Sequence, residues 1–355
     1  MAALRVGIVG AGGMGRTHGL GYRKDSRCEL AAFCDTDREL VDLLCAGGDW
    51  PAVDYGDELV SFSGQAPVPK AYYDVEDLVA DPDIDAVSIC TPNKFHAPVA
   101  MLMMRAGKHV LVEKPMAANA AECEAMIALA REKGVVLQVG HMWRFHSDVE
   151  MIRRVVSEGL IGDIVKVKGY GIHVNWGPDG WFVSRDLAIG GALIDMGVHA
   201  IDTISYVLGD PEPKQVYAKV ETRYADYEVD DSGIVMITYD SGATAIIESG
   251  WRNPYSDGEE ASCQFFGTKG YARIFPTEVR TSIGGKWGRF TPDRTPGDPG
   301  EAAEMVETYF REVNAFIGAI AEGKSSAVPG EVGLRVMKIT DAAYASTEQG
   351  RVIDL

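Results

Sequence analysis

A short stretch in the second half of the chain places acid–base side chains at helical spacing. In LIDMGVHAID (193–202), Asp195, His199 and Asp202 recur at i, i+4 and i+7, which puts three polar groups on one face of a helix. Imidazole has an ordinary pKa near about 6.5 and can accept a proton at neutral pH, while a carboxylate one turn away can orient a hydroxyl. This stretch alone is equally consistent with a solvated helix face. We interpret Asp202 as a structural, hydrogen-bonded anchor.

A lysine at the end of a predicted strand supplies a third candidate group for acid–base chemistry, an ammonium. Lys114 closes HVLVEKP (109–115), at the carboxyl end of a strand that we assign to a parallel sheet, which is where doubly wound sheets bind ligands. Its ammonium can hydrogen-bond to a reacting oxygen or relay a proton; the alternative is a surface lysine. Oxidation of an alcohol by a nicotinamide cofactor needs such groups, because a hydroxyl proton must leave as hydride is transferred.

A glycine pattern near the start of the chain predicts where that cofactor binds. GIVGAGGMG (7–15) contains Gly10-x-Gly12-x-x-Gly15 between a predicted strand and a predicted helix. In a dinucleotide-binding loop the first glycine permits the tight turn and the second lets the backbone approach the pyrophosphate. The third permits close packing of helix on strand. We therefore predict a dinucleotide at this loop.

The type of dinucleotide follows from one acidic residue. Asp35 lies 20 residues after Gly15 at the end of the second predicted strand, where a carboxylate binds the adenosine ribose 2′-hydroxyl. Its charge would repel a 2′-phosphate, and so does that of Asp37, whereas Arg38 would attract one. The sequence therefore predicts NAD, with NADP less favoured.

Two patterns of strands and helices divide the chain. From residue 4 to about 140, continuous apolar strands alternate with helices, which predicts a parallel sheet covered on both faces: a Rossmann domain over 1–142. Beyond that, strands joined by short turns predict an α+β domain over 143–355 with a mainly antiparallel open sheet for substrate binding and oligomerisation. Two helices are predicted at the end of the chain, near 301–322 and 330–349. This prediction allows them to pack on the first domain rather than on the second. Residues 47–70 and 284–300 are predicted loops, the former a candidate flap.

Bulk composition excludes several classes of function. The 355 residues carry a net charge of −18, which argues against a nucleic-acid partner. We expect no membrane partner and no secretory signal, since no apolar run approaches about 20 residues and a strand begins at Leu4. The six cysteines show no metal-binding spacing, so we predict no metal site, reduced thiols and a cytoplasmic location.

Longer motifs identify a family. DIDAVSICTPNKFHAPVAMLMMRAGKHVLVEKPMA (83–117) and GGALIDMGVHAID (190–202) resemble the glucose–fructose oxidoreductase / inositol dehydrogenase / rhizopine-catabolism (Gfo/Idh/MocA) family. The resemblance implies catalytic roles for Lys114, Asp195 and His199, with the last two facing the interdomain cleft. It implies a set of cofactor contacts: Gly10, Gly12, Met14, Gly15, Asp35, Thr91, Pro92, Asn93, His96, Glu113, Lys114 and Arg144. Substrate contacts are expected from Lys114, Trp176, Trp181, Asp195 and His199.

The implied activity is NAD-dependent hydride transfer from a secondary alcohol of a sugar, inositol or related polyol. Two alternatives are a redox-neutral sugar lyase or hydrolase that oxidises its substrate transiently, and a non-catalytic NAD- or sugar-sensing regulator. The family also implies a homodimer or homotetramer that packs through the open sheet, and a cis bond before Pro115. We expect Gly190 and Gly191 to let the chain approach the cofactor closely.

Overall fold

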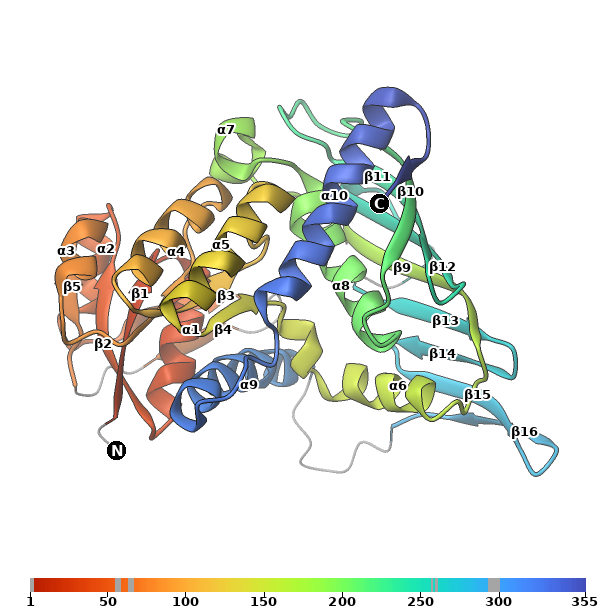
Figure 1. Cartoon of the computed structure of the whole chain (residues 1–355), viewed down its shortest axis with the longest axis horizontal. Helices are drawn as coiled ribbons and strands as arrows, with labels where there is room; N and C mark the ends of the chain where they lie inside the picture. The colour runs from red at the N-terminus through yellow and green to blue at the C-terminus, as the bar shows by residue number, and fades with distance from the viewer. Residues whose placement is uncertain (1–2, 55–58, 63–66, 257, 259–260, 293–300) are drawn as a thin grey trace. The chain divides into compact units, whose positions relative to one another are not determined.

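The computed structural model describes residues 3–54, 59–62, 67–256, 258, 261–292 and 301–355 (Figure 1). Two compact units share the chain: unit 1 comprises Met1–Met142 with Pro299–Gly333, and unit 2 comprises Trp143–Asp298 with Leu334–Leu355. The last stretch of chain is therefore split, because residues 299–333 belong to the nucleotide-binding unit and the final residues to the other.

Unit 1 is built on a six-stranded parallel sheet in the order β5-β2-β1-β6-β7-β8. Its strands are β1 (Leu4–Val9), β2 (Cys28–Cys34), β5 (Lys70–Tyr72), β6 (Ala86–Ile89), β7 (His109–Glu113) and β8 (Leu137–Gly140). The strand order reverses between β1 and β6, and the carboxyl ends at such a switch point form the binding edge of a doubly wound sheet. This confirms the predicted Rossmann architecture.

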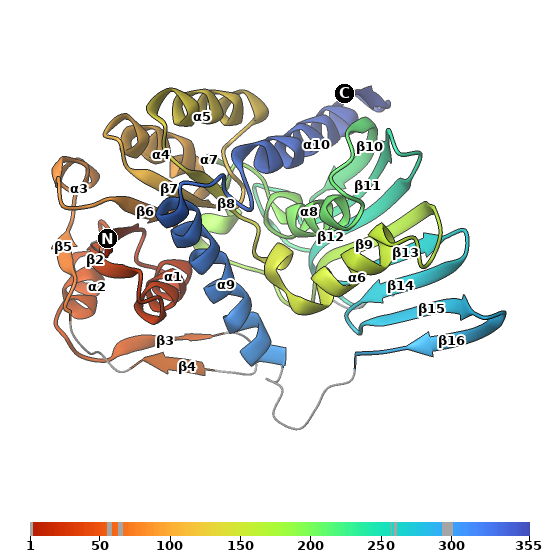
Figure 2. The ribbon, with the colours of Figure 1, turned by 60° about the horizontal axis from the view of Figure 1, so that its bottom comes forward.

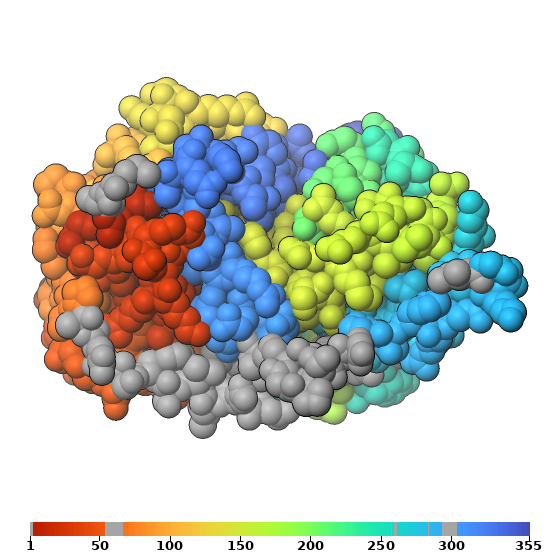
Figure 3. Space-filling view, turned by 90° about the horizontal axis from the view of Figure 1, so that it is seen from below, coloured from red at the N-terminus to blue at the C-terminus, as the bar shows by residue number. Residues whose placement is uncertain are grey.

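Helices cover both faces of this sheet. They are α1 (Gly13–Lys24), α2 (Arg38–Leu44), α3 (Val75–Ala80), η1 (Asn93–Phe95), α4 (His96–Arg105), α5 (Ala120–Lys133) and α9 (Glu301–Glu322). Local sequence explains where several begin, since the carboxylates of Asp37 and Asp74 and the amide of Asn119 accept hydrogen bonds from amides of the first turn. Helix α9 packs beside α1, and Val313 and Phe316 join the core that contains Val6, Ile8 and Phe33 (Figure 3).

The predicted loop 47–70 instead contains a β-hairpin. Strands β3 (Trp50–Asp54) and β4 (Leu59–Phe62) pair antiparallel as a separate two-stranded sheet (Figure 2). Trp50 is buried against Phe33, with ring centroids 5.2 Å apart, and its indole N–H donates to the Leu44 carbonyl. The buried Trp50 side chain therefore anchors a β-hairpin in a segment that the sequence predicts to be a loop.

Unit 2 is built on a nine-stranded sheet in the order β16-β15-β14-β13-β9-β12-β11-β10-β17. Its strands are β9 (Ile164–Val174), β10 (Pro213–Glu221), β11 (Ser232–Tyr239), β12 (Thr244–Asn253), β13 (Cys263–Gly267), β14 (Gly270–Ile274), β15 (Glu278–Ile283), β16 (Lys286–Phe290) and β17 (Ile353–Asp354). All pairs are antiparallel except β9 with β12, which confirms the mainly antiparallel sheet. The loop predicted over 284–300 is wrong at 286–290, because β16 pairs with β15; residues 293–300 lie outside the described residues.

One face of this sheet carries the helices of the unit. They are η2 (Met142–Phe145), α6 (Ser147–Ser157), η3 (Gly180–Val183), α7 (Arg185–Ala188), η4 (Leu193–Gly197), α8 (Val198–Val207) and α10 (Gly330–Gln349), which starts in unit 1. Helix α8 lies over the sheet (Figure 2), and its Ile201 and Ile204 belong to the same apolar core as Val235 and Ile247 of the strands. The segment Arg185–Val207 is long and apolar enough to span a membrane, contrary to our expectation, but 72% of its most apolar window is buried in the protein. We interpret it as a core helix.

Candidate cofactor and catalytic sites

The glycine loop has the geometry that its sequence predicts. Gly10 has φ of +93°, and a Cβ there would lie 2.5 Å from the Cys90 carbonyl oxygen across the switch point. A Cβ at Gly15 would lie 1.9 Å from the Gly10 oxygen, so these two glycines are required by packing. At Gly12 no atom of the described residues lies within 4 Å of the Cβ position. Packing within the protein therefore does not require a glycine at this position, and the open space agrees with the predicted approach of a pyrophosphate to the backbone.

The predicted ribose carboxylate is tied to the same loop. Asp35 Oδ2 accepts a hydrogen bond of 2.7 Å from the Ala11 amide, and Oδ1 accepts one of 3.0 Å from the Asp37 amide. The hairpin adds a contact on the other side, because the Arg16 guanidinium donates to the carbonyl oxygens of Gly12 and Pro51. Arg38 stacks on Tyr73, its Cζ 4.3 Å from the ring centroid. The carboxylate therefore stands beside the glycine loop, as a ribose-binding acid must.

The segment after β6 contributes polar groups at the same sheet edge. The Thr91 hydroxyl oxygen is buried and has no hydrogen-bond partner among the residues described, so it is available to a ligand. Pro92 and half-buried Met14 flank the loop, and Asn93 is buried at the start of η1. These residues fit a dinucleotide. His96 does not face outward: it is 1% exposed, and its ring nitrogens contact the Pro115 and Thr91 carbonyl oxygens.

Glu113 also points into the protein, contrary to a role in direct cofactor contact. Its Oε2 accepts from the Lys114 amide at 3.1 Å, and its Oε1 lies 3.0 Å from His18 Nε2. Burial raises the pKa of Glu113, but the hydrogen bond and charge of His18 outweigh this, so its pKa lies below the usual range. His18, Glu113 and Glu312 are all buried, with ligand-capable atoms within 4.8 Å of one another. Sequence reasoning missed His18, because no spacing in the sequence links it to Glu113, which is 95 positions away.

In unit 2, the catalytic candidates lie on a π-helical turn that continues into an α-helix. The turn η4 covers Leu193–Gly197 and α8 follows directly, so Asp195 does not sit on the regular α-helix that its spacing predicts. Asp195 and His199 are half-buried, whereas Leu193, Ile194 and Val198 are buried, which leaves one partly open polar edge. Single π-helical turns inside helices are frequent at functional sites.

Trp251 holds the Asp195 carboxylate. Its indole nitrogen donates to Asp195 Oδ2 at 3.1 Å, and the Trp251 side chain is fully buried. The Cβ position of Gly171 lies 2.4 Å from the Met196 carbonyl oxygen, so a glycine in β9 is required for the turn to pack on the sheet. Sequence reasoning missed both residues, because they come from strands far along the chain.

Asp230 fixes the start of the same segment. Its carboxylate accepts hydrogen bonds from the amides of Gly191 (2.9 Å) and Leu193 (2.8 Å) and from the Tyr344 hydroxyl (2.8 Å). A Cβ at Gly191 would lie 1.8 Å from the Asp230 carbonyl oxygen, and one at Gly190 would lie 2.4 Å from the Tyr344 hydroxyl. Packing against Tyr344 and Asp230 therefore requires these glycines, and their approach to the cofactor stays a prediction.

We predict that Asp230→Ala lowers the free energy of unfolding by about 2–4 kcal/mol, because two buried amides and a hydroxyl lose their acceptor. Thermal and chemical denaturation measure this. Asp231 provides a matched control, since its carboxylate accepts from the amides of Arg223 and Tyr224 in a neighbouring turn. Both variants should lose stability, but only Asp230→Ala should also lower kcat after refolding in a stabilising osmolyte. Equal kcat for the two variants contradicts a positioning role for Asp230.

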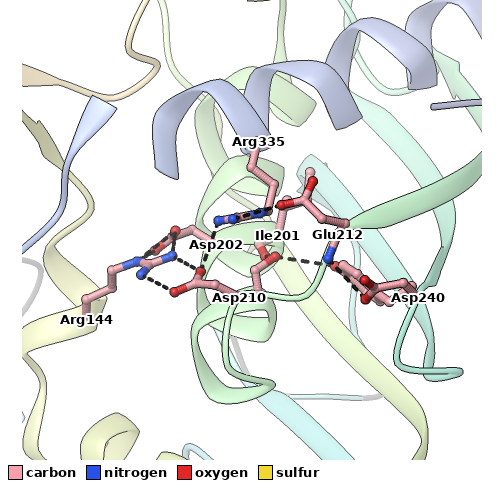
Figure 4. A network of polar contacts seen from close by, with 9 residues as sticks. Arg144, Ile201, Asp202, Asp210, Glu212, Asp240 and Arg335 are labelled. Carbon is pink, nitrogen blue, oxygen red and sulfur yellow. Dashed lines mark hydrogen bonds and ion pairs between the residues drawn. The ribbon is translucent and has the colours of Figure 1, made fainter. Parts of the chain in front are cut away.

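Arg144 occupies a buried ion-pair network (Figure 4). Its guanidinium donates to both carboxylate oxygens of Asp202 at 2.7–3.0 Å and to both of Asp210 at 2.7 and 3.0 Å. Arg335 also reaches Asp210, at 3.3 Å. The Arg144 and Asp202 residues are 5% and 1% exposed. With its donors engaged in this way, Arg144 stabilises the fold of unit 2, and we no longer assign it to cofactor binding. Asp202 is the buried anchor that its apolar surroundings predict.

The two tryptophans predicted to contact substrate differ in their surroundings. Trp176 is 54% exposed and packs edge-on against His173, with ring centroids 4.6 Å apart. Trp181 is half-buried and stacks on Phe182 at 3.8 Å. Nearby Arg185 donates to the Glu228 carbonyl. Both indoles remain candidates for stacking on a sugar ring.

Comparison with known proteins places the chain in a family. Residues 4–141 match a model described as "Oxidoreductase family, NAD-binding Rossmann fold", and residues 149–273 match the GFO/IDH/MocA C-terminal domain. The chain belongs to the GFO/IDH/MocA family of oxidoreductases. Both halves match, which agrees with the resemblance read from residues 83–117 and 190–202.

Curated GFO/IDH/MocA relatives and solved structures cover the whole chain. It is 28% identical to D-glucoside 3-dehydrogenase of Escherichia coli, over 99% of this chain and 97% of the relative. It is 27% identical to myo-inositol 2-dehydrogenase of Thermotoga maritima, over 99% and 98%. Levoglucosan dehydrogenase in complex with NADH and levoglucosan superposes with a TM-score of 0.83 at 26% identity, over 99% of each chain.

Proposed function

We propose that this protein is an NAD-dependent oxidoreductase that transfers hydride between the nicotinamide and a secondary alcohol of a sugar, inositol or related polyol. The observation that carries the proposal is the glycine loop, whose middle glycine leaves its Cβ position open while Asp35 binds the loop beside it. Full-length likeness to relatives named as glucoside and inositol dehydrogenases supports the substrate class.

The residues of the glycine loop, with Asp35 and the Thr91–Asn93 segment, would hold NAD. The cofactor supplies a hydride acceptor at its nicotinamide. Asp35 favours NAD over NADP, because its carboxylate can accept a hydrogen bond from a ribose 2′-hydroxyl but repels the like charge of a 2′-phosphate. The glycine loop begins helix α1 at Gly13, so the helix N-terminus favours the pyrophosphate charge.

We assign Lys114, Asp195 and His199 to proton transfer and substrate orientation. His199 accepts the hydroxyl proton. Asp195, whose carboxylate Trp251 orients, positions the substrate or stabilises the imidazolium, and Lys114 donates a hydrogen bond to the oxygen that becomes a carbonyl. Trp176 and Trp181 are the candidates for contact with the sugar ring.

The proposal is tested by incubating the purified protein with NAD⁺, and separately with NADP⁺, against inositols, aldoses, anhydrosugars and glycosides. Absorbance of NADH and mass spectrometry of products are recorded together. Formation of NADH with a ketone or lactone product supports the proposal, and a higher kcat/KM with NAD⁺ supports the role of Asp35. Products without net NADH would favour redox-neutral elimination or hydrolysis. Absence of both across the panel, with NAD bound, would favour a sensor.

We also propose that the protein forms homodimers or homotetramers through the open face of the unit 2 sheet. Ile234 and Met236 of β11 are 57% and 39% exposed, and Tyr217 of β10, opposite Met236, is 42% exposed. Their neighbours Val235 and Ile237 are buried on the helix-covered face. Apolar side chains on one uncovered sheet face are typical of an interface.

The double variant Ile234→Lys/Met236→Lys is expected to shift the protein toward monomer by at least tenfold in dissociation constant, because it places two charges per subunit in the proposed interface. Analytical ultracentrifugation measures the shift. Leu160→Lys is the matched control, since Leu160 is 49% exposed on the loop between α6 and β9. An unchanged sedimentation profile for the double variant, or an equal change for the control, would place the interface elsewhere.

We propose a cytoplasmic location and a small molecule, rather than a nucleic acid or a membrane, as the partner. All six cysteines are free thiols in the structure, which agrees with a compartment in which thiols are kept reduced. The net charge of −18 disfavours phosphate backbones and anionic lipid surfaces alike.

A further inference from the structure

The turn that carries Lys114 is held by two buried histidines from different helices. His18 of α1 contacts the Glu113 side chain, whose second oxygen accepts from the Lys114 amide. His96, the first residue of α4, contacts the carbonyl oxygen of Pro115 on the other side of the lysine. The backbone of Lys114 is thus fixed through both of its neighbours.

The contacts of His96 determine its protonation. Nδ1 lies 2.7 Å from the Pro115 carbonyl oxygen, and Nε2 lies 2.9 Å from the Thr91 carbonyl oxygen. A carbonyl oxygen only accepts, so each contact requires an N–H on the ring. A neutral imidazole has one N–H, which would leave a nitrogen lone pair facing an oxygen lone pair. Both contacts are hydrogen bonds only if the ring carries two protons.

Buried His18 and half-buried His109 do not have this constraint. His18 Nδ1 faces the Ser88 hydroxyl at 3.0 Å, and a hydroxyl can donate or accept. His109 Nδ1 accepts from the Val136 amide at 2.9 Å, so this nitrogen carries no proton and the ring is neutral. His96 differs in this respect from both His18 and His109.

The charges around His96 act in opposite directions. Burial lowers the pKa of His96, and the Lys114 ammonium lowers it further. The two carbonyl hydrogen bonds and the Glu113 carboxylate raise it, but burial is the largest effect, and on balance the pKa of His96 lies below the ordinary imidazole value. The case for a doubly protonated ring is geometric, because both ring nitrogens lie at hydrogen-bond distance from oxygens that only accept. Glu113 is itself held ionised by His18, so a fixed negative charge lies near the ring.

We propose that His96 is a positioning residue that acts on Lys114. Its two carbonyl contacts outweigh the effect of burial, so it bridges Thr91 and Pro115 as a doubly protonated imidazolium at neutral pH. It joins the loops that follow β6 and β7, so the segment that we assign to cofactor binding and the lysine that we assign to catalysis move as one piece. This deepens the proposed function, since it rests on that function for the role of Lys114, but the protonation of His96 does not depend on it.

The direct test is ¹⁵N NMR of the full-length protein with labelled histidine rings at pH 7, assigned with single histidine variants. Both nitrogens of His96 are expected at the protonated chemical shift. His109 is the internal control, with an unprotonated Nδ1. A neutral His96 ring at pH 7 overturns the proposal. This measurement needs no substrate, so it is independent of whether the enzyme assignment is correct.

The positioning role is tested with His96→Gln, which has a single side-chain nitrogen in place of the two ring nitrogens that contact the Pro115 and Thr91 carbonyls. We expect kcat to fall by about 10²-fold, because a displacement of about 1 Å in the lysine has that effect. The dissociation constant for NAD should change by less than threefold. His109→Gln, at the opposite end of β7, is the matched control and should retain kcat. Equal losses of kcat in both variants would indicate a general effect on folding and contradict the role of His96; if His96→Gln does not fold, the NMR result still decides its protonation.

Discussion

The His199→Ala variant is expected to lose about 10²–10⁴-fold in kcat while its affinity for NAD is preserved, because a general base contributes a factor of this size. His199 lies on α8 in unit 2, whereas the glycine loop and Asp35 belong to unit 1. Cofactor binding, measured by fluorescence titration or calorimetry, should therefore survive the substitution, while steady-state turnover on the best substrate of the panel should not.

A control variant separates loss of the base from disturbance of the helix. Ser205→Ala, on the same helix, removes hydrogen bonds to the Ile201 carbonyl (2.8 Å) and the Tyr239 hydroxyl (3.4 Å). It should lower stability by about 1 kcal/mol and leave kcat within a few fold. If His199→Ala retains near-normal kcat, His199 is not the base, and Lys114 becomes the first candidate to test.

The second large effect concerns stability. Arg144→Met is expected to lower the free energy of unfolding by about 3–5 kcal/mol, because it leaves the buried carboxylate of Asp202 without the cation that faces it. Chemical denaturation at pH 7 measures the loss. The double variant Arg144→Met/Asp202→Leu should recover part of it, since no buried charge is then uncompensated. A surface pair gives the comparison: Lys24→Met, which breaks the exposed contact with Glu307, should cost less than 1 kcal/mol.

The same network predicts the direction of a pH effect. Burial raises the pKa of Asp210, but the hydrogen bond and charge of Arg144 outweigh this and lower it overall. A carboxyl group whose pKa is lower in the folded state stabilises the protein above its unfolded pKa of about 3.9 and loses this contribution as the pH falls through the folded value. The wild-type protein should therefore lose more stability between pH 5 and 2 than Arg144→Met does. Parallel curves for the two proteins would show that Arg144 does not set the titration of Asp210.

Patterns that are local in sequence predicted the fold and part of the candidate site. The spacing of Gly10, Gly12 and Gly15, the strand that ends at Glu113 and the helix that carries His199 each depend on neighbours within one turn or strand, so the sequence displays them directly. The contacts that position these groups are not local. Trp251 reaches Asp195 across 56 residues and His18 reaches Glu113 across 95, and only the folded sheet brings such residues together.

Two interpretations share a common physical limit. Gly190 and Gly191 were interpreted as places of close ligand approach, whereas the Tyr344 side chain at Gly190 and the Asp230 backbone at Gly191 leave no room for a Cβ. His96 was interpreted as a cofactor contact, whereas its nitrogens bind backbone carbonyls. In both cases the residue type indicates a tight or polar environment correctly, but a single sequence does not reveal whether protein or ligand provides it.

The split composition of unit 1 has a consequence for synthesis on the ribosome. The core of the nucleotide-binding unit includes Phe310, Val313 and Phe316 of α9, which pack with Ile8 and other residues of the first strands. These residues emerge only after unit 2 has been almost completely translated. The apolar surface of the first 142 residues that α9 covers therefore stays exposed while about 150 further residues are synthesised. At about 5–20 residues per second this takes roughly 8–30 s. A nascent chain halted before residue 301 should engage chaperones that bind apolar surface, and one that extends past residue 333 should release them.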